Sequence, residues 1–280
     1  MRFGISTHLY HDRRLEREHI AQVADYGFEA LELFATRSHF DYHDPAAVEQ
    51  LALWLSETGL TLHGVHAPIM DRFGKGDVWG TTFSNAVQDQ GKRQAAIRET
   101  ETALHIATRI PFDVLVVHLG TPTRMSAAGD NARAAAVRSA QEICRIAEPF
   151  GVRVALEIIP NPLSDAASLV TTLERDIEAK HVGICFDFGH AHLMGDVADA
   201  IETAAEHLIT THVHDNRRRD DEHLVPYLGS IDWEMALVAM QKIGYDGTYL
   251  FELADNDSPA KVLEEARRAR QRFERALAQR

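Results

Sequence analysis

The sequence predicts a single (β/α)₈ barrel that spans residues 1–280. Eight short runs rich in β-branched and apolar residues alternate with amphipathic helical stretches along the whole chain. No Pro/Ser-rich linker or low-complexity segment separates the chain into two halves, which favours one domain. A doubly wound open sheet is the alternative, but no strand-turn-helix unit carries the Gly-rich phosphate-binding pattern of such folds.

The predicted elements follow a regular order of strand and helix. The eight predicted strands are residues 2–9, 30–35, 60–67, 114–120, 153–160, 181–188, 208–215 and 247–253. Between them, apolar residues recur three and four positions apart, which is the spacing of one helix face. Several helical stretches start at an Asp, which caps an N-terminus, and stop at a Gly, which ends a helix at little conformational cost. The predicted caps are Asp44, Asp196 and Asp232, and the predicted stops are Gly27, Gly59, Gly151 and Gly244.

Composition excludes several classes of protein. The chain carries 29 Lys and Arg against 42 Asp and Glu, a formal net charge of −13, which is the wrong sign for neutralising nucleic-acid phosphates. The longest apolar runs are too short to span a bilayer, and the N-terminal residues lack the pattern of a secretory signal. Because Cys144 and Cys185 fall inside predicted elements, we expect a reducing, cytoplasmic location. The sequence does not decide the oligomeric state, and a homo-oligomer is one possibility.

Ionisable side chains cluster at the C-terminal ends of the predicted strands, where (β/α)₈ barrels carry their chemistry. Six consecutive strands, from the third to the eighth, end in His, Asp or Glu, and two more such residues follow the seventh. These residues are His66, His118, Glu157, Asp187, His190, His212, His214, Asp221, His223 and Glu252. The strand ends converge on one volume, whereas histidines with separate structural roles have no reason to share one rim.

The residue types at this rim predict a metal site. Imidazole and carboxylate groups together are the ligands of a divalent ion such as Mn, Zn, Co, Fe or Mg. Cysteine is absent from the set, which disfavours a closed structural zinc site. Asp187 ends an apolar run, and burying an unpaired carboxylate costs on the order of several kcal/mol. We therefore expect a bound cation to neutralise it.

Five segments share the pattern of one known superfamily. They are VALE (154–157), FDFGH (186–190), HVHD (212–215), GSIDW (229–233) and LFEL (250–253). In this order they resemble the strand-five Glu, the strand-six Asp-x-x-His, the strand-seven His-x-x-Asp, the start of the seventh helix and the final Glu of the xylose isomerase-like barrel superfamily. That superfamily includes sugar and sugar-phosphate isomerases and epimerases, related dehydratases and the family 2 AP endonucleases. The resemblance covers the whole chain.

The isomerase and epimerase members hold one divalent metal with a Glu, Asp, His and Glu. The resemblance therefore implies four ligands here, namely Glu157, Asp187, His212 and Glu252. It also implies that Glu157 and Glu252 take and return a carbon-bound proton while the ion stabilises an enediolate. Transfer at one face would give an isomerase, and transfer at both faces an epimerase.

Further residues are expected around this centre. His190 and His66 are predicted to contact the substrate beside the metal, and Arg217 to bind a substrate hydroxyl or phosphate. His214 lies two residues beyond His212 along a strand and so faces the same side, as an alternative ligand or a supporting residue.

The endonuclease branch supplies a rival interpretation, a phosphodiesterase with three zinc ions and nine ligands. The sequence has a counterpart to each ligand, once His66, His118, His190, Asp221 and His223 join the four above. Three features favour an isomerase, an epimerase or a related lyase instead. EIIPN (157–161) continues from the fifth strand's Glu where the endonucleases have a short Asn-Thr-Ala-Gly segment. YLGSIDW replaces their Leu-Gly-Glu-Gly, and the charge balance is acidic. A multinuclear enzyme with another substrate, and a sugar-binding protein without catalysis, are the remaining alternatives.

The substrate is expected to be a small sugar or sugar phosphate, and the sequence does not distinguish the two. Specificity depends on loops, above all the long segment 69–91 after the third strand, which lies where a lid would be. Phe73 and Trp79 in this segment are candidates either to cover a sugar or to form a small core of the loop.

Overall fold

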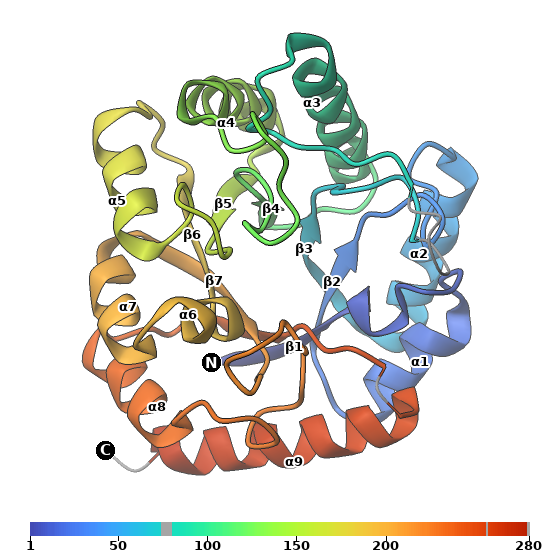
Figure 1. Cartoon of the computed structure of the whole chain (residues 1–280). Coiled ribbons are helices and arrows are strands. Elements are labelled where there is room, and N and C mark those ends of the chain that lie inside the picture. Colours follow the sequence, from blue (N-terminus) through green and yellow to red (C-terminus); the bar gives the residue numbers. More distant parts are fainter. Residues whose placement is uncertain (74–79, 256, 279–280) are drawn as a thin grey trace.

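The computed structural model describes residues 1–73, 80–255 and 257–278, and its centre is a closed parallel barrel surrounded by helices (Figure 1). Each strand pairs in parallel with the next, and β1 pairs with β8, which closes the ring. This confirms the predicted fold class and the order of the eight predicted strands, although every strand ends earlier than predicted, and residues 7–9 of the first predicted strand lie in a 3₁₀ helix. The strands are β1 (Arg2–Ser6), β2 (Ala30–Phe34), β3 (Thr61–His66), β4 (Val114–Val117), β5 (Arg153–Glu157), β6 (Val182–Asp187), β7 (Leu208–Val213) and β8 (Thr248–Phe251).

The α-helices form the outer layer of the barrel (Figure 1). They are α1 (Arg17–Asp25), α2 (Pro45–Thr58), α3 (Gln90–Leu104), α4 (Arg133–Ala147), α5 (Ala166–Arg175), α6 (Phe188–Met194), α7 (Val197–Ala204), α8 (Trp233–Lys242) and α9 (Pro259–Ala278). Four short 3₁₀ helices lie in the described chain, η1 (Thr7–Tyr10), η2 (His105–Thr108), η3 (Glu148–Phe150) and η4 (Ala205–His207). The three predicted Asp caps each accept a backbone N–H, and the four predicted Gly stops all have positive φ.

The apolar core has two parts. The larger part packs the outer faces of the strands against the helices, and Trp233, Phe186 and Phe273 are among its fully buried side chains. A small second cluster combines residues of β4, β5 and β6, including Ala155 and Cys185. Successive side chains of a strand point to opposite faces, so residues two positions further on share the orientation of this inner cluster. This alternation places Glu157 and Asp187, the last residues of β5 and β6, on the inner face at the barrel mouth.

The described parts of the segment predicted to form a lid pair with each other next to the barrel mouth. Met70 pairs with Thr82 in an antiparallel bridge, and the Asp71 carboxylate accepts a hydrogen bond of 2.7 Å from the Thr81 N–H. Residues 74–79, and with them Trp79, lie outside the described residues. In the part of the chain that the structure describes, no helix has the length and apolar character needed to cross a membrane.

Close contact between β6 and β7 requires a glycine at position 183. A Cβ there would lie 2.5 Å from the His207 carbonyl oxygen and 2.7 Å from the Ile209 side chain. We expect Gly183→Ala to lower the free energy of unfolding by about 1–3 kcal/mol, because the strands must separate to admit the methyl group. Urea denaturation measures the loss. Gly195→Ala, where the added Cβ would meet nothing within 4 Å, is the matched control, and equal stability of the two variants would contradict the prediction.

Candidate metal centre and substrate pocket

Four predicted ligands meet at the barrel mouth. Glu157 and Asp187 end β5 and β6, His212 lies near the end of β7, and Glu252 follows β8. One donor atom from each lies within 4.8 Å of the others, and all four side chains are buried. The His212 Nδ1 atom is 3.2 Å from Glu157 Oε1 and 3.4 Å from Glu252 Oε2. These four residues are called the central group below.

A second group shares Glu157 with the central group. His66 at the end of β3 and His118 just after β4 approach the same carboxylate from the neighbouring strands. Their Nε2 atoms lie 3.2 Å and 3.0 Å from Glu157 Oε2, while Oε1 faces His212. Glu157 therefore presents one oxygen to each group, as a bridging ligand would.

A third group contains His190, His214, Asp221 and His223. The Asp221 carboxylate lies 3.0 Å from His190 Nε2 and 3.2 Å from His223 Nε2. His214 Nε2 lies 3.0 Å from the Asp187 carboxylate, which joins this group to the central one. The structure thus brings together all ten donors that the sequence singles out, in three adjacent groups.

The buried carboxylates of these groups require positive charge close by. Burial by itself raises the pKa of Glu157, but the imidazoles of His118 and His212 outweigh it and hold that pKa well below its usual range. Burial likewise opposes the charge of His190, yet Asp187 and Asp221 raise its pKa well above the ordinary value. A divalent cation meets the same demand, and its binding displaces protons from such ligands. The donor set of buried carboxylates and imidazoles therefore fits a divalent metal ion.

Glu32 belongs to this site although the sequence analysis does not single it out. It points inward from β2, is buried, and accepts a 3.0 Å hydrogen bond from His212 Nε2. With its proton held at Nε2, His212 keeps the Nδ1 lone pair for the central group, an arrangement typical of metal-bound histidines. The signal in the sequence was the one charged residue in the apolar run ALELF (30–34).

A cavity of about 440 Å³ opens above the donor groups. Glu157, Glu252, His190 and Asp221 line it, while Asp187 and His212 lie outside its lining. Part of the lining is apolar, with side chains from β2, from the segment after β3 and from the loop after β4. These apolar residues are Phe34, Ile69, Met70, Phe73, Phe83, Pro122 and Met125. The predicted lid segment therefore contributes to the pocket, and Phe73 faces it.

Two further histidines line this cavity and were not predicted as site residues. His8 lies in η1 and His11 immediately follows it. Burial, and for His8 the nearby His223 and His11, lower the pKa of both imidazoles. Burial therefore favours the neutral form of both rings. His8 falls near the C-terminal end of the first predicted strand, residues 2–9, a rim position that could have singled it out, whereas His11 lies beyond that strand.

Arg217 lies away from the cavity lining. Its guanidinium forms an ion pair with Glu222, and Nη2 also donates to the Leu228 carbonyl oxygen at 3.4 Å. More than half of its side chain is exposed, at 58%. The predicted contact of Arg217 with the substrate thus receives no support from its position, because the loop turns this side chain toward its own acidic neighbour.

The loop that carries Asp221 and His223 is anchored by one buried carboxylate, Asp215. Asp215 accepts hydrogen bonds from the backbone N–H groups of Asn216, Tyr227, Ser230 and Ile231 and from the Trp233 indole, at 2.8–3.1 Å. His223 itself has φ of +46°, a conformation uncommon outside glycine. Asp215, the acidic residue of HVHD (212–215), therefore organises the loop.

Replacing Asp215 tests this role. We expect Asp215→Asn to lower the free energy of unfolding by about 2–4 kcal/mol, because a neutral amide leaves several buried N–H donors poorly satisfied. The midpoint of urea denaturation is the measurement. Asp246→Asn, a change at an exposed position, is the control and is expected to have little effect. An Asp215→Asn protein as stable as the control would rule out the anchoring role.

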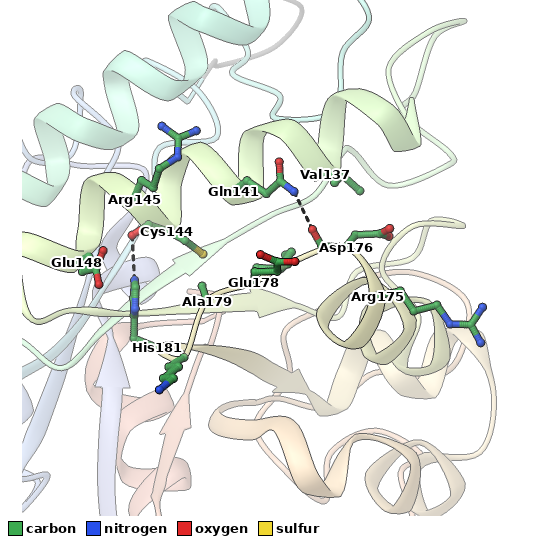
Figure 2. A pocket seen from close by; sticks show the side chains of 12 residues that line it. Val137, Gln141, Cys144, Arg145, Glu148, Arg175, Asp176, Glu178, Ala179 and His181 are labelled. Atoms are coloured by element: carbon green, nitrogen blue, oxygen red, sulfur yellow. Dashed lines mark hydrogen bonds between the residues drawn. The ribbon is translucent and has the colours of Figure 1, made fainter.

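A larger cavity, of about 890 Å³, lies between α4 and the segment that precedes β6 (Figure 2). Figure 2 shows two of its contacts, His181 Nε2 donating to the Cys144 carbonyl oxygen and the Gln141 amide donating to the Asp176 carbonyl oxygen. Because His181 immediately precedes β6, this cavity lies at the N-terminal ends of the strands. Catalytic sites of (β/α)₈ barrels occupy the other end, so the smaller cavity is the candidate active site.

Comparison with known proteins identifies the family. A xylose isomerase-like TIM barrel model matches residues 20–273, and the chain belongs to this family. A crystal structure of a D-tagatose 3-epimerase-like protein superposes with a TM-score of 0.80 at 26% identity, covering 99% of this chain and 97% of that one. A crystal structure of the IolI protein with a bound zinc atom superposes with a TM-score of 0.77 at 18% identity, covering 98% of each chain.

The curated relatives include sugar isomerases and epimerases. D-psicose 3-epimerase from Ruminiclostridium cellulolyticum is 24% identical over 270 residues, covering 90% of this chain and 83% of the epimerase. Inosose isomerase from Bacillus licheniformis is 28% identical over 151 residues, about half of either chain at 49% and 53%.

Proposed function

We propose that this protein is a divalent-metal-dependent isomerase or epimerase of a sugar or a related polyol. The observation that carries the proposal is the pair of carboxylates, Glu157 and Glu252, which line one cavity from separate strands and share one donor group. Relatives that are sugar isomerases and epimerases support it. Among the described residues that line the cavity there is no Lys or Arg, which favours an unphosphorylated substrate.

The central group would hold the metal, with Glu32 fixing the orientation of His212. A divalent cation bound there supplies the positive charge that stabilises an enediolate. Glu157 and Glu252 face the cavity and are the candidates to take a proton from the carbon beside the carbonyl and to return one. The apolar side chains of the lining limit the water beside the reacting carbons.

Carboxylate-to-amide variants test the acid and base roles. Glu157→Gln and Glu252→Gln are each expected to reduce kcat by at least about 10²-fold, because an amide accepts no proton. Incorporation of solvent deuterium into the substrate measures the proton transfer directly, and metal content is determined on the same samples. Glu234→Gln, at an exposed position of α8, is the control. Full activity in either cavity variant with metal still bound would remove that residue from the mechanism.

A second candidate function is a trinuclear metallo-phosphodiesterase of the AP endonuclease type. The observation in its favour is the division of the donors into three adjacent groups with Glu157 shared between two of them. Such a cluster suits phosphodiester hydrolysis, because several cations can stabilise attacking and leaving oxygens together. The net charge of −13 and a described cavity lining without Lys or Arg count against binding DNA.

Metal stoichiometry separates the two candidates. For an isomerase or epimerase we expect about one divalent ion per chain, held by the central group, in protein purified without chelator. Removing it should lower Tm, because the buried carboxylates lose their compensating charge, and adding Mn or Zn should restore it. Elemental analysis and thermal unfolding are the measurements. Three ions per chain together with cleavage of an abasic-site duplex would favour the phosphodiesterase.

A further inference from the structure

His8 and His11 are brought together by the local structure at the end of β1. The Ser6 side chain accepts the His8 N–H and begins η1, a 3₁₀ helix in which residues three apart lie over one another. The two imidazoles stack with their centroids 4.4 Å apart and their planes at 29°. The spacing of the two histidines in HLYH (8–11) thus forms a pair on one face of the turn.

Hydrogen bonds determine which nitrogen of each ring is available. His8 Nδ1 donates to the Leu253 carbonyl oxygen at 3.0 Å, and His11 Nδ1 donates to the His8 carbonyl oxygen at 2.7 Å. A carbonyl oxygen only accepts, so each ring carries its proton at Nδ1 and a neutral ring has a lone pair at Nε2. No hydrogen bond from another described residue reaches either Nε2 atom.

The surrounding rings hold the pair in place. His8 stacks on His223 with a centroid distance of 4.6 Å and meets the edge of Phe34 at 5.0 Å. His11 packs against Phe73 at 4.2 Å. Since both histidines line the cavity that contains Glu157 and Glu252, their acceptors are oriented before a ligand binds, which lowers the entropic cost of binding.

We propose that His8 and His11 form an acceptor subsite for hydroxyl groups of a neutral polyol, at the part of the substrate away from the reacting carbons. This inference rests on the proposed function, which places the reacting carbons beside Glu157 and Glu252. A lone pair at Nε2 attracts an O–H donor and repels the oxygens of a phosphate or carboxylate. The subsite therefore suits the hydroxyl groups of an uncharged sugar or cyclitol.

Variants that keep the ring but remove the nitrogens test the subsite. The full-length, metal-loaded protein is titrated with D-psicose, D-fructose, L-ribulose and an inosose by calorimetry, and turnover is followed in parallel. His8→Phe and His11→Phe should each raise Kd and KM about three- to tenfold, and the double variant more, with kcat within about twofold of wild type. His11→Gln, which retains an acceptor oxygen, should bind nearly as wild type does. His105→Phe is the matched control, because His105 contacts a phenyl ring outside the cavity, that of Phe150.

Deoxy sugars give a second readout that a general loss of structure would not produce. Wild type should bind a sugar that lacks the hydroxyl recognised by the subsite as weakly as the variants bind the complete sugar. The variants should bind the deoxy sugar and the complete sugar equally well, because they have already lost this contact. The inference is overturned if the double variant, with Tm and metal content of wild type, binds these polyols within twofold of wild type. It is equally overturned if wild type binds none of them. Binding that depends on His8 and His11 but gives no turnover would remove the proposed function and leave the subsite standing.

Discussion

Three buried carboxylates that face one another, those of Glu157, Asp187 and Glu252, impose the constraint on which the rest of the barrel mouth depends. Ionised groups removed from water and placed this close repel one another, and each loses its hydration. Positive charge must therefore reach them. The chain surrounds them with imidazoles, which either carry a proton themselves or offer a lone pair to a bound cation. The stability of the fold therefore depends on whether protons or a cation neutralise these carboxylates.

The residues around this centre hold the donors in position. Glu32 lies inside the barrel and accepts a hydrogen bond from His212 Nε2. The other nitrogen of that ring, Nδ1, is therefore left to face the central group. Asp215 gathers the backbone of the following loop, so that Asp221 and His223 reach the site from a segment without regular secondary structure. Neither carboxylate lines the cavity, yet Glu32 orients His212 in the central group, and Asp215 positions the loop whose Asp221 and His223 line the cavity.

The cavity lining combines two kinds of side chain. Carboxylates and imidazoles make up one part of it, and phenyl rings and aliphatic side chains, among them Phe34 and Phe83, make up the other. A polyhydroxylated ring or chain has the matching character, since its C–H groups are apolar and its hydroxyls are directional. The segment 69–91 contributes Phe73 and Phe83 to the apolar part of the lining.

By itself, the sequence determined the order of strands and helices and the rim at which the ionisable residues gather. Both follow from periodicity: apolar spacing sets each element, and a strand's alternation carries Glu157 and Asp187 to the mouth. Only the tertiary structure decided that Glu32 supports His212 and that His8 and His11 face the cavity, while Arg217 turns to Glu222. These contacts join residues from different strands, turns and loops. They form only when the barrel closes and its loops pack, so no local pattern in the chain predicts them.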